Sequence, residues 1–292
     1  MRWIITFILI LLFSCREISV DKKILDVKTN KTNTAVETIK KKAVNGILVC
    51  AHRSYHKNAP ENSLKSILLA IENQIDIVEI DVRTTKDSFL ILMHDDSIGR
   101  VTNGNGFIKD YTYSELQKFN LKIGDSITGE KIPLLHDALI LAKGKVIPNL
   151  DLKAVDYNQL YDLLKSIGMA HDVISFIGKK NKVQEMIAID SLYAVLPLSK
   201  TKEDILFYLE NTKSQLQHFT DESFTEGNMD WMLKKGELIF VNTLWDEDDD
   251  FILGNTASMD SVIALKPTII QTDHPLLLID YLKRKKLGSY GH

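Results

Sequence analysis

The chain has 292 residues, of which 45% are hydrophobic, and a formal net charge of −3. This length suits one large domain, because α/β barrels commonly reach such a size undivided. Nucleic-acid-binding proteins usually carry a basic excess, so the charge balance argues against nucleic acid as a partner. Nothing in the composition indicates an obligate protein partner.

The first fifteen residues have the pattern of an export signal. Met1-Arg2 precedes an apolar run, 3–13, that is too short to span a membrane as a helix. Leu12-Phe13-Ser14-Cys15 is similar to a bacterial lipobox, in which the cysteine is lipidated and becomes the new N-terminus. This similarity implies that Cys15 anchors an exported protein to a bacterial membrane, facing the periplasm or the cell surface. Ordinary signal cleavage and an uncleaved anchor are the alternatives.

Residues 16–45 are rich in Lys, Thr, Asn and Asp and have no sustained apolar period. Such a composition cannot bury enough apolar surface to fold by itself. We therefore expect a flexible tether between the lipid anchor and the folded body.

From residue 46 to 287, short apolar runs alternate with amphipathic stretches. The expected strands are 47–52, 77–82, 146–152, 172–177, 192–197, 215–219, 238–243 and 268–272. The expected helices are 62–74, 134–143, 157–168, 180–189, 202–212, 228–235, 257–265 and 275–285. Strands that alternate with helices pair in parallel through right-handed crossovers, and about eight such units predict a (β/α)₈ TIM barrel. An open doubly wound sheet would have the same tally, but no Gly-rich nucleotide fingerprint follows the first strand.

One strand-like segment, 89–94, breaks this alternation. Too few residues separate it from the strand at 77–82 for a helical crossover, so it must return antiparallel. That return would bring His94 back to the level of Asp81. Residues 96–133 then form an insertion, in which Asn103-Gly104-Asn105-Gly106 indicates turns rather than core.

Residues with acid, base and metal-binding chemistry gather at the predicted carboxyl ends of three strands, where barrel enzymes form their active sites. They are His52 and Arg53, Glu79 and Asp81, and Asp151 and Lys153. Residues two apart in a strand point to the same side, so Glu79 and Asp81 share a face. Carboxylates beside imidazoles and a guanidinium are suited to metal-assisted attack on a phosphate ester.

These residues belong to a series of ordered sequence blocks. The blocks are His52-Arg53-Ser54, Pro60-Glu61-Asn62-Ser63, Glu79-Ile80-Asp81-Val82, Met93-His94-Asp95, Arg100-Val101-Thr102-Asn103-Gly104, Ile132-Pro133-Leu134, Asn149-Leu150-Asp151-Leu152-Lys153 and Gln271-Thr272-Asp273-His274-Pro275. Together they resemble the glycerophosphodiester phosphodiesterase family. The resemblance implies a phospholipase C-like phosphodiesterase barrel that hydrolyses a small-molecule glycerophosphodiester to glycerol 3-phosphate and an alcohol.

The resemblance also implies roles for the site residues. His52 and His94 would be the acid/base pair, and which of them donates first stays open. Arg53 and Lys153 would bind phosphate oxygens, or alternatively form salt bridges with neighbouring carboxylates. Trp245 would stack against the alcohol part of the substrate, or else pack in the interior.

A divalent cation, Ca²⁺ or Mg²⁺, is the expected cofactor, because Glu79, Asp81 and Asp151 offer oxygen ligands suited to a hard dication. Glu61 is a further candidate ligand, although an acidic residue before a helix also favours the positive end of its dipole. Two rival functions remain: a phospholipase-type phosphodiesterase acting on lysolipid or inositol lipid, and a non-catalytic surface-binding lipoprotein. An apolar groove beside the barrel mouth would favour the first rival.

Two local features complete the predictions. Ser54 stands where the family has glycine, and serine costs about 1–2 kcal/mol if the backbone there has positive φ. The acidic run 246–250 is expected to be solvated.

Overall fold

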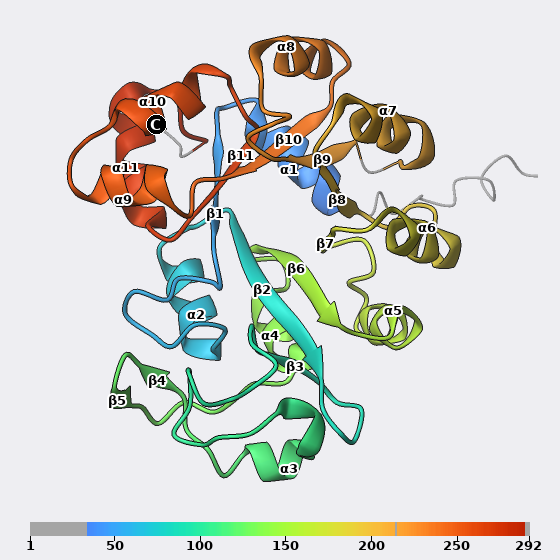
Figure 1. The fold of residues 1–292 in the computed structure, drawn as a ribbon, viewed down its shortest axis with the longest axis vertical. Coiled ribbons are helices and arrows are strands. Elements are labelled where there is room, and N and C mark those ends of the chain that lie inside the picture. The colour runs from blue at the N-terminus through green and yellow to red at the C-terminus, as the bar shows by residue number, and fades with distance from the viewer. Residues whose placement is uncertain (1–33, 214, 290–292) are drawn as a thin grey trace, which may run out of the picture. The chain divides into compact units, whose positions relative to one another are not determined.

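The computed structural model describes residues 34–213 and 215–289. Within these residues, parallel strands close into a barrel because β1 pairs with both β2 and β11 (Figure 1). The barrel strands are β1 (Leu48–Ala51), β2 (Ile77–Thr84), β6 (Ile147–Ala154), β7 (Ile174–Ile177), β8 (Val195–Ser199), β9 (Leu216–Phe219), β10 (Leu238–Asn242) and β11 (Ile269–Thr272). The predicted eight-stranded α/β barrel is confirmed, and each predicted strand is present.

Helices surround the barrel as an outer layer (Figure 1). They are α2 (Leu64–Glu72), α4 (Leu135–Ala142), α5 (Tyr157–Ser166), α6 (Lys180–Ile189), α7 (Lys202–Asn211), α8 (Glu226–Lys234), α9 (Asp246–Ile252), α10 (Ala257–Ala264) and α11 (Pro275–Lys285). Local sequence explains several of their starts. Ser63 caps α2 in a reciprocal capping box with Ser66, and Pro275 occupies the first turn of α11, where no backbone donor is needed.

The N-terminal end of the barrel is closed by a helix that the sequence did not predict, α1 (Ala35–Ala43). Its Ala35 and Ile39 are buried in an apolar cluster with the first residues of several strands, including Leu48, Ile77 and Ile147. The tether predicted over residues 16–45 is therefore wrong for its last part. The polar composition there belongs to the exposed face of α1, while burial of one apolar side supplies the stabilisation.

The segment after β2 returns antiparallel, as predicted. β3 (Leu90–Leu92) pairs antiparallel with the end of β2, with Val82 opposite Leu92. The insertion that follows contains η2 (Ile108–Asp110), α3 (Tyr113–Leu116), β4 (Lys122–Ile123) and β5 (Ser126–Ile127). Turns were predicted for residues 103–106, and these lie outside the helices and strands of the insertion. The insertion packs with β3 around a separate apolar cluster, formed by Ile91, Met93, Ile98, Val101, Ile108, Leu116, Leu121 and Ile132.

The export signal and lipobox predicted over residues 1–15, and the tether up to residue 33, lie outside the described residues. Among the residues that the structure describes, no helix combines the length and the apolar character needed to cross a membrane.

Candidate active site

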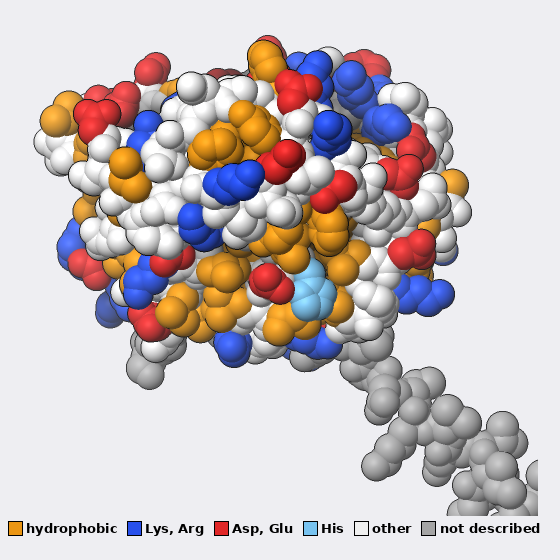
Figure 2. Space-filling view, turned by 90° about the horizontal axis from the view of Figure 1, so that it is seen from below, with side chains coloured by type: hydrophobic (Ala, Val, Ile, Leu, Met, Phe, Trp, Pro, Cys, Tyr) orange, Lys and Arg blue, Asp and Glu red, His pale blue; other side chains and the backbone are white. Residues whose placement is uncertain are grey.

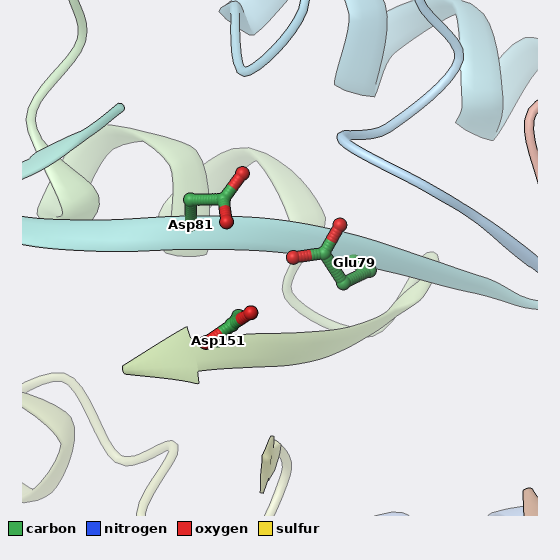
Figure 3. A group of neighbouring side chains, drawn as sticks. All are labelled: Glu79, Asp81 and Asp151. Carbon is green, nitrogen blue, oxygen red and sulfur yellow. The ribbon is translucent and has the colours of Figure 1, made fainter. Parts of the chain in front are cut away.

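Three carboxylates converge at the C-terminal end of β2 and β6. Glu79 and Asp81 project from the same side of β2, and the parallel register places Asp81 opposite Asp151 of β6 (Figure 3). The possible ligand oxygens of the three side chains all lie within 4.8 Å of one another. The alternation along one strand and the register between two strands are therefore sufficient to assemble the cluster.

Burial makes this concentration of negative charge costly. Burial raises the pKa of Glu79 well above its usual value, and repulsion from Asp81 and Asp151 raises it further. Burial also raises the pKa of Asp151, against the opposing effect of Lys153. The ammonium of Lys153 lies 2.6 Å from Asp151 and 3.1 Å from Asp81, so part of the charge is neutralised. Among the described residues, Lys153 is the cation that forms salt bridges with this cluster.

The donor set fits a hard divalent cation. All three side chains offer oxygen, they converge within one coordination sphere, and their mutual repulsion would be relieved by a positive ion. Glu61, the further candidate ligand, is not part of this group. Both of its oxygens accept hydrogen bonds from Arg53 and Arg100.

The loop that follows β1 supports the acidic cluster. The backbone N–H of Arg53 donates to Glu79 at 2.7 Å, and the side-chain amide of Asn62 donates to Asp81 at 2.8 Å. Asn62 also accepts from the backbone N–H of Asp81. The loop adopts positive φ at Arg53 (49°), Ser54 (64°) and Asn62 (53°). The strain expected at Ser54 is therefore present, at a cost of about 1–2 kcal/mol.

His52 and His94 are each anchored through Nδ1 to a carboxylate. The Nδ1 of His52 lies 2.8 Å from Asp273, and that of His94 lies 2.7 Å from Asp95. A carboxylate accepts, so Nδ1 carries the proton and the Nε2 of a neutral ring is left as the acceptor. Although burial opposes it, the hydrogen bond from His52 lowers the pKa of Asp273.

Both histidines line one cavity of about 340 Å³ at the barrel mouth. The other lining residues are Arg53, His56, Leu244, Trp245 and Asp273. His94 reaches this cavity because β3 runs back along β2, where the N–H of Met93 bonds to the carbonyl of Asp81 at 3.0 Å. Arg83 of β2 then holds the carbonyl of His94 with two hydrogen bonds of 2.9 and 2.7 Å.

The predicted substrate-binding residues lie in different surroundings. Trp245 is 66% exposed and lines the cavity, so the alternative of interior packing is wrong. The guanidinium of Arg53 contacts Glu61 at the cavity wall, while Lys153 pairs with the acidic cluster. The salt bridges that were the alternative prediction for Arg53 and Lys153 are therefore present.

The acidic run 246–250 was expected to be solvated, and this is wrong for Asp248. Its carboxylate is buried and accepts hydrogen bonds from the hydroxyls of Thr243 and Thr272 and from the backbone N–H of Asp273. Asp248 thereby holds in place the backbone of the residue that anchors His52.

Asp95, Arg100 and Asp273 lie in the matching sequence blocks but were not predicted to have a role at the site. Asp95 directly follows His94, and Asp273 stands in a matching block far along the chain, and both positions were signals of a role at the site. His56 was also missed. Its Nδ1 lies 2.8 Å from the carbonyl of His52 and its Nε2 lies 3.6 Å from Asp273, so it extends the polar wall of the cavity.

Residues 52–223 match the sequence profile of the Glycerophosphoryl diester phosphodiesterase family. The chain belongs to this family. A glycerophosphodiester phosphodiesterase of Caldanaerobacter subterraneus subsp. tengcongensis is 40% identical over 110 residues, which are 37% of this chain and 45% of that protein. The human glycerophosphodiester phosphodiesterase 1 is 36% identical over 97 residues, which are 32% of this chain and 29% of that protein. These matches thus span less than half the length of the curated relatives.

Solved structures extend the similarity over most of the fold. A glycerophosphoryl diester phosphodiesterase from Parabacteroides distasonis has a TM-score of 0.76 and 26% identity, and the match covers 86% of this chain and 93% of that one. An Oleispira antarctica phosphodiesterase in complex with the product sn-glycerol-3-phosphate has a TM-score of 0.63 and 20% identity, with 83% and 99% coverage. The second similarity concerns the fold alone.

A Glu79→Gln variant tests the acidic cluster. Above the usual pKa of 4.5, Glu79 in the unfolded chain ionises while the buried side chain retains its proton, so the stability of the metal-free fold falls as pH rises. We expect the variant to melt higher than wild type in EDTA, by a margin that grows as the pH rises above the usual pKa of glutamate. Wild type should gain about 2.7 kcal/mol from a divalent cation at one hundred times its Kd, and the variant much less.

The measurement is thermal unfolding with and without Ca²⁺ or Mg²⁺. Glu72→Gln, at an exposed position of α2, is the control and should behave as wild type. Equal stabilisation of wild type and Glu79→Gln by the cation would contradict the assignment.

Proposed function

We propose that this chain hydrolyses glycerophosphodiesters to glycerol 3-phosphate and an alcohol with a bound divalent cation. The observation that carries the proposal is that two Nδ1-anchored imidazoles, His52 and His94, open on one cavity together with Arg53. Family membership agrees with it, and so does the presence of sn-glycerol-3-phosphate in the Oleispira antarctica structure.

The reaction needs a base, an acid and compensation of charge. In the proposed first step, the hydroxyl next to the diester gives its proton to one imidazole and its oxygen bonds to phosphorus. The bond from phosphorus to the alcohol oxygen breaks, and that oxygen takes a proton from the other imidazole. Water then opens the cyclic phosphate, with the two imidazoles exchanging roles.

The carboxylate partners of the two rings suit this exchange. Asp273 and Asp95 keep each ring in the orientation that presents Nε2 and stabilise the imidazolium that forms when a proton arrives. Arg53 supplies a planar pair of donors for the phosphate oxygens, and Lys153 becomes available for the same task when its carboxylate partners bind a cation. A cation held by the three carboxylates would supply positive charge that offsets the negative charge of the phosphate oxygens.

The cavity favours a small polar substrate over a lipid. Leu244 and Trp245 contribute its apolar wall, whereas histidines, Arg53 and Asp273 form the rest. A more apolar groove of about 360 Å³ exists elsewhere, lined in part by Phe89, Leu134 and Leu163, and it has no lining residue in common with the mouth cavity. Figure 2 shows apolar side chains on the lower face in groups that charged side chains interrupt.

A turnover assay on glycerophosphocholine and glycerophosphoethanolamine, with and without EDTA, tests the proposal. His52→Ala and His94→Ala should each lower kcat by about 10²–10⁴-fold, the usual contribution of general acid–base catalysis. His136→Ala is a matched control, because His136 also bonds through Nδ1 to the following aspartate but lies outside the cavity. Activity in EDTA would exclude the metal, binding without turnover would favour the binding-protein rival, and preference for lysolipid would favour the phospholipase.

We also propose that the protein is exported and held at a bacterial membrane through a lipid on Cys15. This proposal rests on the lipobox-like sequence 12–15. Wild type expressed in a bacterium should sediment with membranes and incorporate labelled palmitate, whereas Cys15→Ala should do neither. Ser14→Ala keeps the cysteine and is the control. Equal membrane partition of wild type and Cys15→Ala would contradict the anchor.

A further inference from the structure

Arg100, at the start of the insertion, makes three short hydrogen bonds with two carboxylates near the mouth cavity. Its Nε donates to Asp95 Oδ2 at 2.6 Å, and its Nη1 and Nη2 donate to the two oxygens of Glu61 at 2.7 Å each. The pair with Glu61 is bidentate, the geometry in which a guanidinium binds a carboxylate with most strength and direction. Nothing in the proposed chemistry assigns a role to this residue.

Each carboxylate that Arg100 holds is also bonded to a residue of the proposed site. The other oxygen of Asp95 accepts from Nδ1 of His94 at 2.7 Å, and both oxygens of Glu61 lie 3.2 Å from Nη1 of Arg53. Arg100 is therefore connected through Asp95 to His94, a predicted acid/base group. It is connected through Glu61 to Arg53, the predicted phosphate-binding guanidinium.

The charges along this series balance. The two guanidinium groups of Arg53 and Arg100 are paired with the two carboxylates of Asp95 and Glu61. Without Arg100, one excess negative charge would remain there, and Glu61 would bind Arg53 with no competing partner. Hydrogen bonds from Arg100 and His94 outweigh the effect of burial and lower the pKa of Asp95 to about 2, so that this carboxylate stays ionised.

Isolated surface ion pairs contribute little, but a bidentate pair within a network is the exception. Arg100 is 45% exposed and Glu61 only 15% exposed, so the network runs from solvent into the wall of the site. Arg100 is not among the residues that line the mouth cavity, and instead lines an adjacent cavity with His56 and Glu61.

We propose that Arg100 is a positioning residue, which orients His94 through Asp95 and Arg53 through Glu61. The inference rests on the proposed function. It gives the insertion an indirect part in the reaction, because Arg100 belongs to the insertion and holds Asp95 and Glu61 in place beside the barrel.

The test is steady-state kinetics of Arg100→Ala on glycerophosphocholine. We expect kcat/KM to fall about 10–100-fold, the usual effect of removing the partner of a functional side chain. Guanidinium ion at low concentration should restore part of the lost kcat, whereas ammonium at equal ionic strength should not, because ammonium lacks the planar pair of donors. Arg100→Lys should likewise remain impaired.

Two further comparisons distinguish positioning from general stabilisation. Combining Arg100→Ala with Asp95→Asn should cost less than the product of the single effects, because both act on His94 through one contact. Glu61→Gln should act mainly on KM, through Arg53. Lys109→Ala removes an exposed cation from the same insertion and should leave both constants unchanged.

Unimpaired turnover by Arg100→Ala would overturn this inference alone. The inference would also be overturned if Arg100→Ala had a lowered Tm and guanidinium ion did not restore its kcat, since the role of Arg100 would then be structural. Absence of turnover in wild type would overturn the proposed function and this inference together.

Discussion

Mutual repulsion of three carboxylates, two of them buried and one half-buried, is the constraint around which this barrel mouth is arranged. Strand alternation places Glu79 and Asp81 on the same side of β2, and the parallel register places Asp151 of β6 opposite Asp81. A cluster of this kind is stable only if cations and hydrogen-bond donors surround it. Lys153, the amide of Asn62 and the backbone N–H of Arg53 supply that compensation. The positive-φ loop after β1 follows from the same demand, since it turns the N–H of Arg53 toward Glu79.

Closure of the barrel then determines where the histidines lie. β11 pairs with β1 so that Thr272 lies opposite Ala51, and the next residues, Asp273 and His52, meet although 221 positions separate them. His94 arrives by a different route, along the antiparallel β3. The two rings thus come from a barrel strand and from a hairpin, yet each is anchored in the same way, through Nδ1 to an aspartate. The insertion joins this arrangement through Arg100, which links the partner of His94 to the partner of Arg53.

Much of this could be predicted from the sequence, because strands buried on both faces and the short connection before residue 89 leave clear patterns. The antiparallel return, and with it the placement of His94, follows from the shortness of the connection between the strand at 77–82 and the segment at 89–94. What could not be predicted depends on distant contacts. Ile39 is one of a few apolar residues in a largely polar stretch. It becomes buried only when the first residues of several barrel strands come together and form the cluster against which it packs. Asp248 looks solvated because it lies in an acidic run. Its burial depends on hydrogen bonds donated by Thr243, Thr272 and Asp273, which the local sequence does not reveal. The two arginines that bond to Glu61 could not be predicted either, because Arg100 lies 39 positions away in the insertion.

The central claim is that Glu79, Asp81 and Asp151 hold one divalent cation at the mouth where both histidines meet. Anomalous diffraction from crystals grown with Mn²⁺ tests it most directly. We expect a single strong peak at about 2.0–2.6 Å from oxygens of all three carboxylates, with the ammonium of Lys153 displaced from them. A map without a peak there, or with the ion elsewhere while Lys153 still bridges Asp81 and Asp151, would contradict it.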